Sequence, residues 1–164
     1  GITSWSLRGL NTDLDLDGIP TRSSGTVAAE PATHPNGVTE IDHIVVLSPY
    51  LGRTVDALAA IDAYPRRERD GELGGRPIRQ VFFRFGEVII EVVGSPEGKG
   101  EGPSSLWGIT YTVADIDSTA EFLGDRTTPV KDAVQPGRRI TTLKHRDFGM
   151  SVRTAMISPH ILGG

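Results

Sequence analysis

The chain has 164 residues, a formal net charge of −4 and no cysteine. That length fits one domain or two small fused modules. Without a basic stripe we expect no nucleic-acid partner, and without cysteine there is neither a disulfide nor thiolate chemistry, which favours a cytoplasmic protein. The longest apolar stretch, residues 88–93, contains Glu91 and is too short to cross a bilayer, so no membrane partner is expected.

The N-terminal 39 residues are predicted to be a strand followed by a linker. Residues 1–10 alternate in polarity and predict a strand that must pair at an edge. Because residues 2–7 already alternate like a strand and the first residue is not methionine, we interpret the chain as beginning partway through a longer protein. Residues 11–39 are rich in Asp, Gly, Pro, Ser and Thr, a composition typical of linkers.

One acidic segment in this linker resembles the start of a calcium-binding loop. Residues 13–18 read Asp-Leu-Asp-Leu-Asp-Gly, but loop position twelve, where an EF-hand needs an acidic ligand, is Ser24. The segment is therefore interpreted as an acidic turn between extended segments.

A strand-turn-helix pattern follows, and extended sequence comes after it. Residues 41–47 predict a strand, Ser48 an N-cap and Pro49 the first helical position, with an apolar stripe continuing to about Ile61. After an exposed strand at 66–70, a tight hairpin is predicted around a central glycine; its strands are 79–85 and 87–93.

The same pattern occurs a second time beyond a Gly-rich linker at 94–105. Residues 107–113 predict a strand, and Asp115 caps a short helix that ends at Gly124. Extended segments are expected at 129–133, 138–145 and 151–157. Each copy thus reads as one strand, one helix and about three further strands, which indicates an internal duplication.

The residues of this duplication resemble the vicinal oxygen chelate superfamily, which contains glyoxalase I, the bleomycin-resistance proteins and the extradiol dioxygenases. Segments 41–46, 86–93 and 112–117 carry the resemblance, which extends over about 38–159 and is closest to uncharacterised bacterial glyoxalase-like proteins. It implies an α+β fold of two βαβββ modules in a domain at 40–160, with residues 1–39 as the end of a divergent flanking module. The modules, 40–97 and 104–160, would form a curved mixed sheet around a cavity, with the N-terminal strand at an edge, and a homodimer would be the usual assembly.

The resemblance also implies where a divalent metal would bind. The matching ligand positions are His43 and Glu91 in the first copy, and Gly108 with either Arg153 or Thr154 in the second. Only the first two are plausible metal ligands. Because two protein ligands hold a metal weakly, we expect either no cofactor or one weakly bound divalent ion.

His43 and Glu91 are the strongest candidate site residues, each with a plain alternative. His43 would face the cavity as a ligand or acid/base group, or would be a half-buried histidine bonded to a neighbour such as Glu91. Glu91 lies in an apolar strand, where a carboxylate needs a partner, a proton or a metal. It is the candidate catalytic acid or base, unless it faces a sheet edge.

Further residues are expected to contact a small-molecule ligand rather than to do chemistry. Gln80, Phe82, Thr110 and Arg139 join His43 in this predicted set. Arg139 is one of several basic residues on or beside predicted strands, where an arginine that faced a cavity would hold a carboxylate or phosphate. The default for such residues is a solvated face; the others are Arg79, Arg84, Arg138, Lys144 and Arg146.

Three functions remain open from the sequence. The first is a glyoxalase-like cavity protein that binds a small molecule with an incomplete metal site, metal-free or weakly metal-binding. The second is a divalent-metal-dependent lyase, isomerase or dioxygenase that acts on an oxygen-chelating substrate. The third is an interaction module of a longer chain.

Overall fold

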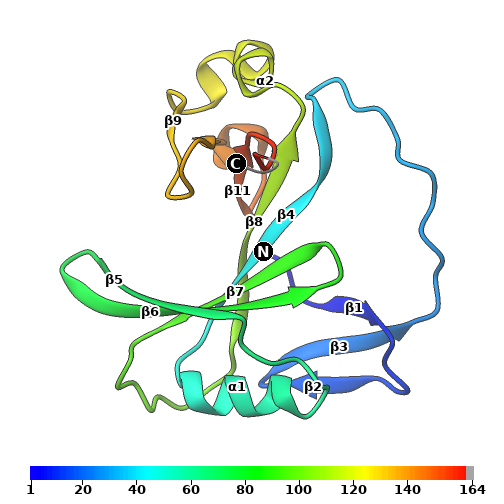
Figure 1. Ribbon diagram of the computed structural model, residues 1–164, viewed down its shortest axis with the longest axis vertical. Coiled ribbons are helices and arrows are strands. Elements are labelled where there is room, and N and C mark those ends of the chain that lie inside the picture. Colours follow the sequence, from blue (N-terminus) through cyan, green and yellow to red (C-terminus); the bar gives the residue numbers. More distant parts are fainter. Residues whose placement is uncertain (162–164) are drawn as a thin grey trace. The chain divides into compact units, whose positions relative to one another are not determined.

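A computed structural model describes residues 1–161 and divides the chain into two compact units (Figure 1). Unit 1 contains Gly1–Ala28 and Ile44–Trp107; unit 2 contains Ala29–His43 and the chain from Gly108 onward. The division falls inside strands β4 (Val38–Leu47) and β8 (Ser105–Val113), so each of these strands contributes to both units.

The strand order confirms an α+β fold built from a duplicated βαβββ pattern. One copy runs β4, α1, β5, β6, β7, and the other runs β8, α2, β9, β10, β11. Eight strands form a mixed sheet in the order β5-β6-β7-β4-β8-β11-β10-β9, and a separate sheet has the order β1-β3-β2. The parallel pairing of β8 with β11 beside antiparallel hairpins makes the large sheet mixed.

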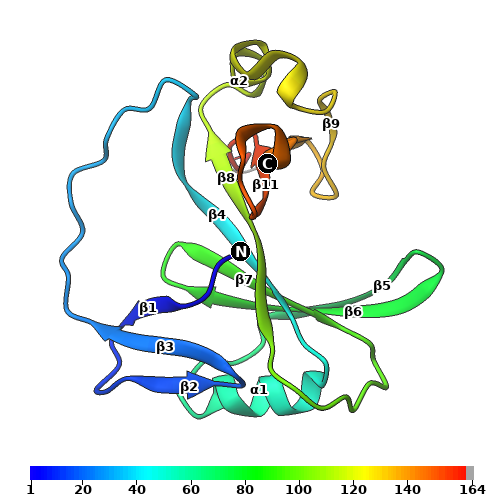
Figure 2. The ribbon, with the colours of Figure 1, turned by 180° about the vertical axis from the view of Figure 1, so that it is seen from behind.

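Unit 1 has a core between the helix, the large sheet and the small sheet (Figure 2). Alternate residues of β6 and β7 fill it: Val81, Phe83, Ile90 and Val92 are at most 2% exposed. This unit contains β1 (Trp5–Arg8), β2 (Leu14–Leu16), β3 (Ile19–Ser24), α1 (Leu51–Ala59), β5 (Arg67–Leu73), β6 (Arg76–Phe85) and β7 (Val88–Gly94). The hairpin predicted around Gly86, which has a φ of 62°, is confirmed.

The predicted start of α1 is wrong by two residues. Its N-cap is Tyr50 rather than Ser48, and Pro49 precedes the helix. The reason is that Ser48, just after β4, is still hydrogen-bonded to the sheet, since its N–H donates to the carbonyl of Val93 at 2.8 Å. The Ser48 hydroxyl instead accepts the Tyr50 N–H at 3.1 Å.

The linker predicted for 11–39 is wrong over Leu14 to Ser24, which forms the β2–β3 hairpin. Its turn is Asp17-Gly18, with φ values of 52° and 89°, a pair of left-handed residues that favours a tight hairpin. Gly18 is also needed for space, because a Cβ there would lie 2.2 Å from that of Pro103. β1 pairs in parallel with β3, so the N-terminal strand is an edge strand, but of this small sheet.

The carboxylate of Asp17 ties the hairpin turn to the helix. It accepts hydrogen bonds from Arg53, from the Thr54 hydroxyl at 2.5 Å and from the Ser104 hydroxyl at 2.7 Å. Burial alone would raise the pKa of Asp17, but these bonds and the guanidinium charge hold it below its usual range. The turn interpreted from sequence as acidic is therefore a structural anchor.

Unit 2 has a smaller core beneath its own helix. Val113, Ile116, Leu143 and Met156 are its buried members. Asp115 caps α2 as predicted, by accepting the N–H groups of Asp117 and Ser118, and Gly124 ends the helix. The elements of this unit are α2 (Ile116–Leu123), β9 (Lys131–Asp132), β10 (Arg139–Thr142), β11 (Arg153–Ile157) and the 3₁₀ turns Gly124–Arg126 and His145–Phe148.

Within residues 1–161, no helix combines the length and the apolar character needed to cross a bilayer.

Replacing Asp17 with alanine should destabilise the fold by about 2 kcal/mol at neutral pH, because three donors lose a charged acceptor. The pKa of Asp17 is lowered by folding, so its contribution is complete above the unfolded pKa and is lost as the pH falls through the folded value. Urea denaturation should therefore show the gap between wild type and Asp17→Ala closing in acid. The control is Asp56→Ala on the exposed side of α1; equal losses from both variants would contradict this role.

Candidate functional site

The face of β5, β6 and β7 opposite the unit 1 core carries the predicted site residues of unit 1. Since Val81 and Phe83 point into the core, Gln80 and Phe82 point to the opposite face. Phe82 pairs directly with Glu91 of β7, so these two side chains share that face. The sheet therefore brings Gln80, Phe82 and Glu91 together on one face, and their binding and catalytic roles stay predictions.

A hydrogen-bonded row crosses this face, which we call the Arg69–Gln80–Glu91 relay. Arg69 Nε donates to Gln80 Oε1 at 2.8 Å, and Gln80 Nε2 donates to Glu91 Oε1. The Arg69 guanidinium also lies over the Phe82 ring, 5.8 Å from its centroid. The carboxylate of Glu91 was expected to need a partner in its apolar strand, and the amide of Gln80 is one such partner.

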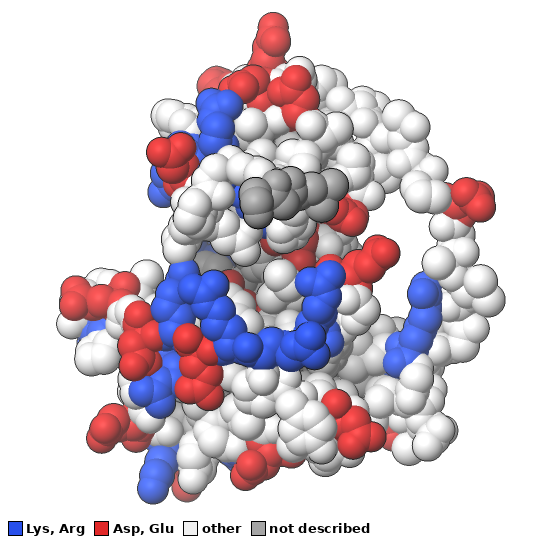
Figure 3. All heavy atoms as spheres, viewed as in Figure 1, with Lys and Arg blue, Asp and Glu red and all other residues white. Residues whose placement is uncertain are grey.

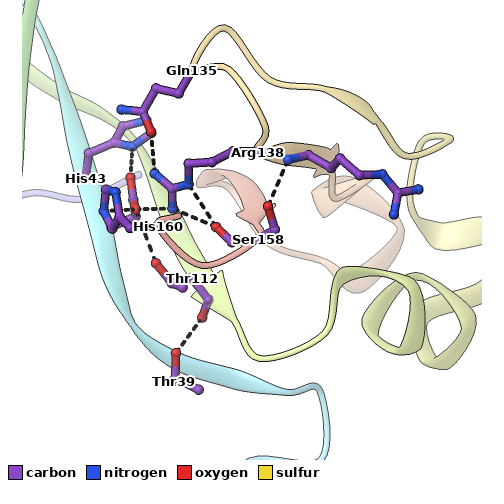
Figure 4. Close-up of polar contacts among 9 residues, drawn as sticks. Thr39, His43, Thr112, Gln135, Arg138, Ser158 and His160 are labelled. Atoms are coloured by element: carbon purple, nitrogen blue, oxygen red, sulfur yellow. Dashed lines mark hydrogen bonds and ion pairs between the residues drawn. The ribbon is translucent and has the colours of Figure 1, made fainter. Parts of the chain in front are cut away.

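A second polar group lies in unit 2, centred on Asp42 of β4 (Figure 4). Its carboxylate forms an ion pair with Arg138 at 2.6 Å, and each of the two side chains is only 2% exposed. The same carboxylate is 2.8 Å from His43 Nδ1 and 3.3 Å from His160 Nε2. The Thr112 hydroxyl donates to it at 3.2 Å. We call these residues the Asp42 cluster.

The Asp42 carboxyl is ionised over the usual pH range. Burial alone would raise its pKa, but hydrogen bonds from His43 and Arg138 and the charge of Arg138 hold the pKa far below its usual range. An ionised carboxylate only accepts hydrogen bonds, so His43 Nδ1 donates to it. In its neutral form, His43 therefore has its proton on Nδ1.

Arg138 uses its donors to hold the polypeptide in place. Its Nε and Nη2 donate to the carbonyl of Ser158 at 2.9 and 2.7 Å, and its Nη1 donates to Gln135 at 2.6 Å. Together with the Asp42 bond, these contacts engage each nitrogen of the guanidinium. Arg138 is thus a structural residue of the cluster, and the solvated face expected by default for this arginine is wrong.

The other predicted residues lie as follows. His43 is half-buried on β4 and bonded to Asp42. Thr110 is 5% exposed on β8, where it pairs with Ala155. Arg139 forms an ion pair with Asp117 at 2.8 Å, with both side chains largely in solvent. The ligand-binding roles of these residues stay predictions.

Among the described residues, the ligand positions implied by the resemblance supply two plausible metal ligands, His43 and Glu91. Parallel pairing places Arg153 opposite Gly108, which settles the register that the sequence left open between Arg153 and Thr154. Neither Gly108 nor Arg153 supplies a metal ligand. Among the described residues, no group of three or more His, Cys, Asp or Glu side chains is placed to hold a metal ion. Catalytic zinc sites typically need three protein ligands.

Sequence reasoning did not select Asp42 or Arg69. Asp42 is flanked by Ile41 and His43 in a strand whose later residues are apolar, which is the same signal that selected Glu91. Arg69 lies in a strand of low apolar content, and only the β5–β6 register places it beside Gln80.

Replacing Arg138 with methionine should lower the free energy of unfolding by about 3–5 kcal/mol, because Asp42 is left buried without its counter-charge. The double variant Asp42→Asn/Arg138→Met, which removes both charges, should recover part of that loss. The neighbouring Arg139→Met is the matched control and should cost less than about 1 kcal/mol, since its ion pair is exposed. Urea denaturation at neutral pH measures all three; similar losses from the two single variants would be incompatible with this account.

Comparison with known proteins finds likeness in structure alone. No family model and no curated protein matches the sequence. Methylmalonyl-CoA epimerase from Mycobacterium tuberculosis is similar with a TM-score of 0.60 and 14% identity, over 79% of this chain and 94% of that one. A triple mutant of 4-hydroxymandelate synthase from Streptomyces coelicolor is similar with a TM-score of 0.65 and 16% identity, over 92% of this chain and 60% of that one.

A methylmalonyl-CoA epimerase in complex with methylmalonyl-CoA and NH4⁺ is also similar, with a TM-score of 0.58 and 18% identity, over 77% of this chain and 99% of that one. At these identities the likeness concerns the fold and not the chemistry. With the duplicated βαβββ pattern already described, these matches confirm the expected resemblance: the chain has the fold of the vicinal oxygen chelate superfamily.

Proposed function

We propose that this chain is a glyoxalase-like protein that binds a small molecule on the face of β5, β6 and β7 opposite the unit 1 core, without a tightly bound metal. Phe82 would supply apolar contact area, and the Arg69–Gln80–Glu91 relay would supply polar contacts of fixed orientation. The cavity and the homodimer implied by the resemblance belong to this proposal as expectations.

The observation that carries the proposal is the relay itself. Polar side chains on a sheet face are normally mobile and solvated, whereas here three of them are joined across three strands. Gln80 is held from both ends, so its amide cannot rotate without losing a charge-assisted hydrogen bond. A preorganised polar row beside an aromatic ring is the arrangement that a binding site requires.

A small cavity in the core of unit 1 is not an alternative ligand-binding site. It measures about 10 Å³, room for about one water molecule, and is lined mainly by apolar core residues such as Leu16 and Val92. A metabolite does not fit there. The likeness to a complex with methylmalonyl-CoA supports small-molecule binding as one use of this fold, and it identifies no substrate for this chain.

The first test is a thermal-shift screen of small metabolites in metal-free buffer. A compound present at about a hundred times its Kd should raise Tm by about 5 °C or more. Gln80→Ala and Phe82→Leu should abolish the shift, because they remove the relay and the ring. Tyr64→Leu, an exposed aromatic residue outside these strands, should leave the shift unchanged. A shift that survives both relay-face variants would place the ligand elsewhere.

The second test is metal content. Protein purified without a histidine tag should contain far less than one equivalent of divalent metal by elemental analysis, since two ligands bind weakly. His43→Ala and Glu91→Ala should leave that content unchanged, and added divalent ions should not raise Tm. Near-stoichiometric metal that both substitutions remove would instead support a metal-dependent lyase, isomerase or dioxygenase.

A further inference from the structure

The two faces of β5, β6 and β7 differ in charge. Residues of β5 alternate between them, so Arg67 and Arg69 lie on the relay face, while Glu68 and Asp70 lie on the other. On that other face Arg79 is neutralised by Asp70, at 2.6 Å. Strand alternation gives the relay face four guanidinium groups and one carboxylate, Glu91; the four are Arg67, Arg69, Arg76 and Arg84. Figure 3 shows basic side chains over this part of the chain, with acidic side chains beside them.

Arg69 is the one arginine of this group that is oriented from two directions. Its Nε is engaged by Gln80, and its plane lies over Phe82. Among the contacts of the described residues, its Nη1 and Nη2 atoms have no hydrogen-bond acceptor. A guanidinium held by Nε and by an aromatic ring keeps its terminal fork in a fixed direction, which lowers the entropic cost of binding an oxyanion.

Arg67 adds a second positive charge beside that fork. It is two residues away on the same strand, so its Cα lies about 7 Å from that of Arg69 and its side chain projects from the same face. It pairs with Phe82 across the β5–β6 ladder. Two arginines at this spacing can reach one carboxylate or phosphate group together.

We propose that the relay face is an oxyanion-binding site in which Arg69, oriented by Gln80 and Phe82, receives a carboxylate or phosphate group with help from Arg67. This inference rests on the proposed function and names its ligand class: a small organic anion.

Isothermal titration with malonate and, separately, with inorganic phosphate tests this at a fixed ionic strength set by chloride. Binding should weaken about tenfold or more in Arg69→Gln, which loses a charge-assisted fork. Arg69→Lys, which keeps the charge without the fork, should also bind more weakly than wild type. The control Arg79→Gln makes the same charge change on the opposite face and should stay within about twofold of wild type. Whichever of malonate and phosphate binds with the lower Kd identifies the preferred oxyanion.

Several outcomes would overturn the inference. Equal weakening in Arg69→Gln and Arg79→Gln would mean that overall charge alone attracts the anion, and no binding of either probe would mean that no oxyanion site exists. A neutral compound from the thermal-shift screen that is lost in Phe82→Leu but retained in Arg69→Gln would overturn the ligand class while leaving the proposed function intact. Failure of both the screen and the titrations would remove the proposed function as well.

Discussion

Burial of alternate residues in β6 and β7 is the constraint on which unit 1 depends. Val81, Phe83, Ile90 and Val92 enter the core and each contributes about 2 kcal/mol by leaving water. A shift of either strand by one residue would expose this whole set, so the register is strongly fixed. The same alternation sends Gln80, Phe82 and Glu91 to the other face and aligns them with β5. The strand register that buries the core residues therefore also places the candidate site residues side by side.

Unit 2 relies on a different interaction, the buried pair of Asp42 and Arg138. Neither charge is accessible to solvent, and the pair is satisfied only because Thr112, Gln135 and Ser158 occupy the remaining hydrogen-bonding positions. Such pairs add little net stability compared with apolar packing, but losing one member is costly. The pair therefore specifies one arrangement of the Ser158 segment against β4. The Asp42 carboxylate also fixes Nδ1 as the protonated nitrogen of neutral His43.

The duplicated pattern could be predicted from the sequence because each copy contains local signals: β-branched strands, the Asp115 cap and the Gly86 hairpin. The β2–β3 hairpin was missed although Asp17-Gly18 between alternating apolar residues is a hairpin signal, because the Pro- and Ser-rich surroundings favoured a linker. Glu91 was selected because it interrupts an apolar strand, whereas Gln80 entered only among the residues expected to contact a ligand. The sequence did not identify Arg69 and Arg138 as members of these polar groups, because an arginine is expected to be exposed to solvent. Only the pairing of distant strands shows what each of them contacts. Long-range register is the information that a single sequence lacks.

We propose above all that this protein binds its ligand on the relay face of β5, β6 and β7. Amide chemical-shift mapping of the isotopically labelled chain, with a compound that raises its Tm, tests this most directly. The account predicts that the largest shifts cluster on Arg67, Arg69, Gln80, Phe82 and Glu91, while the amides around the Asp42 cluster change little. Shifts concentrated around Asp42 and Arg138, with the relay face unchanged, would contradict the account and assign binding to the other unit.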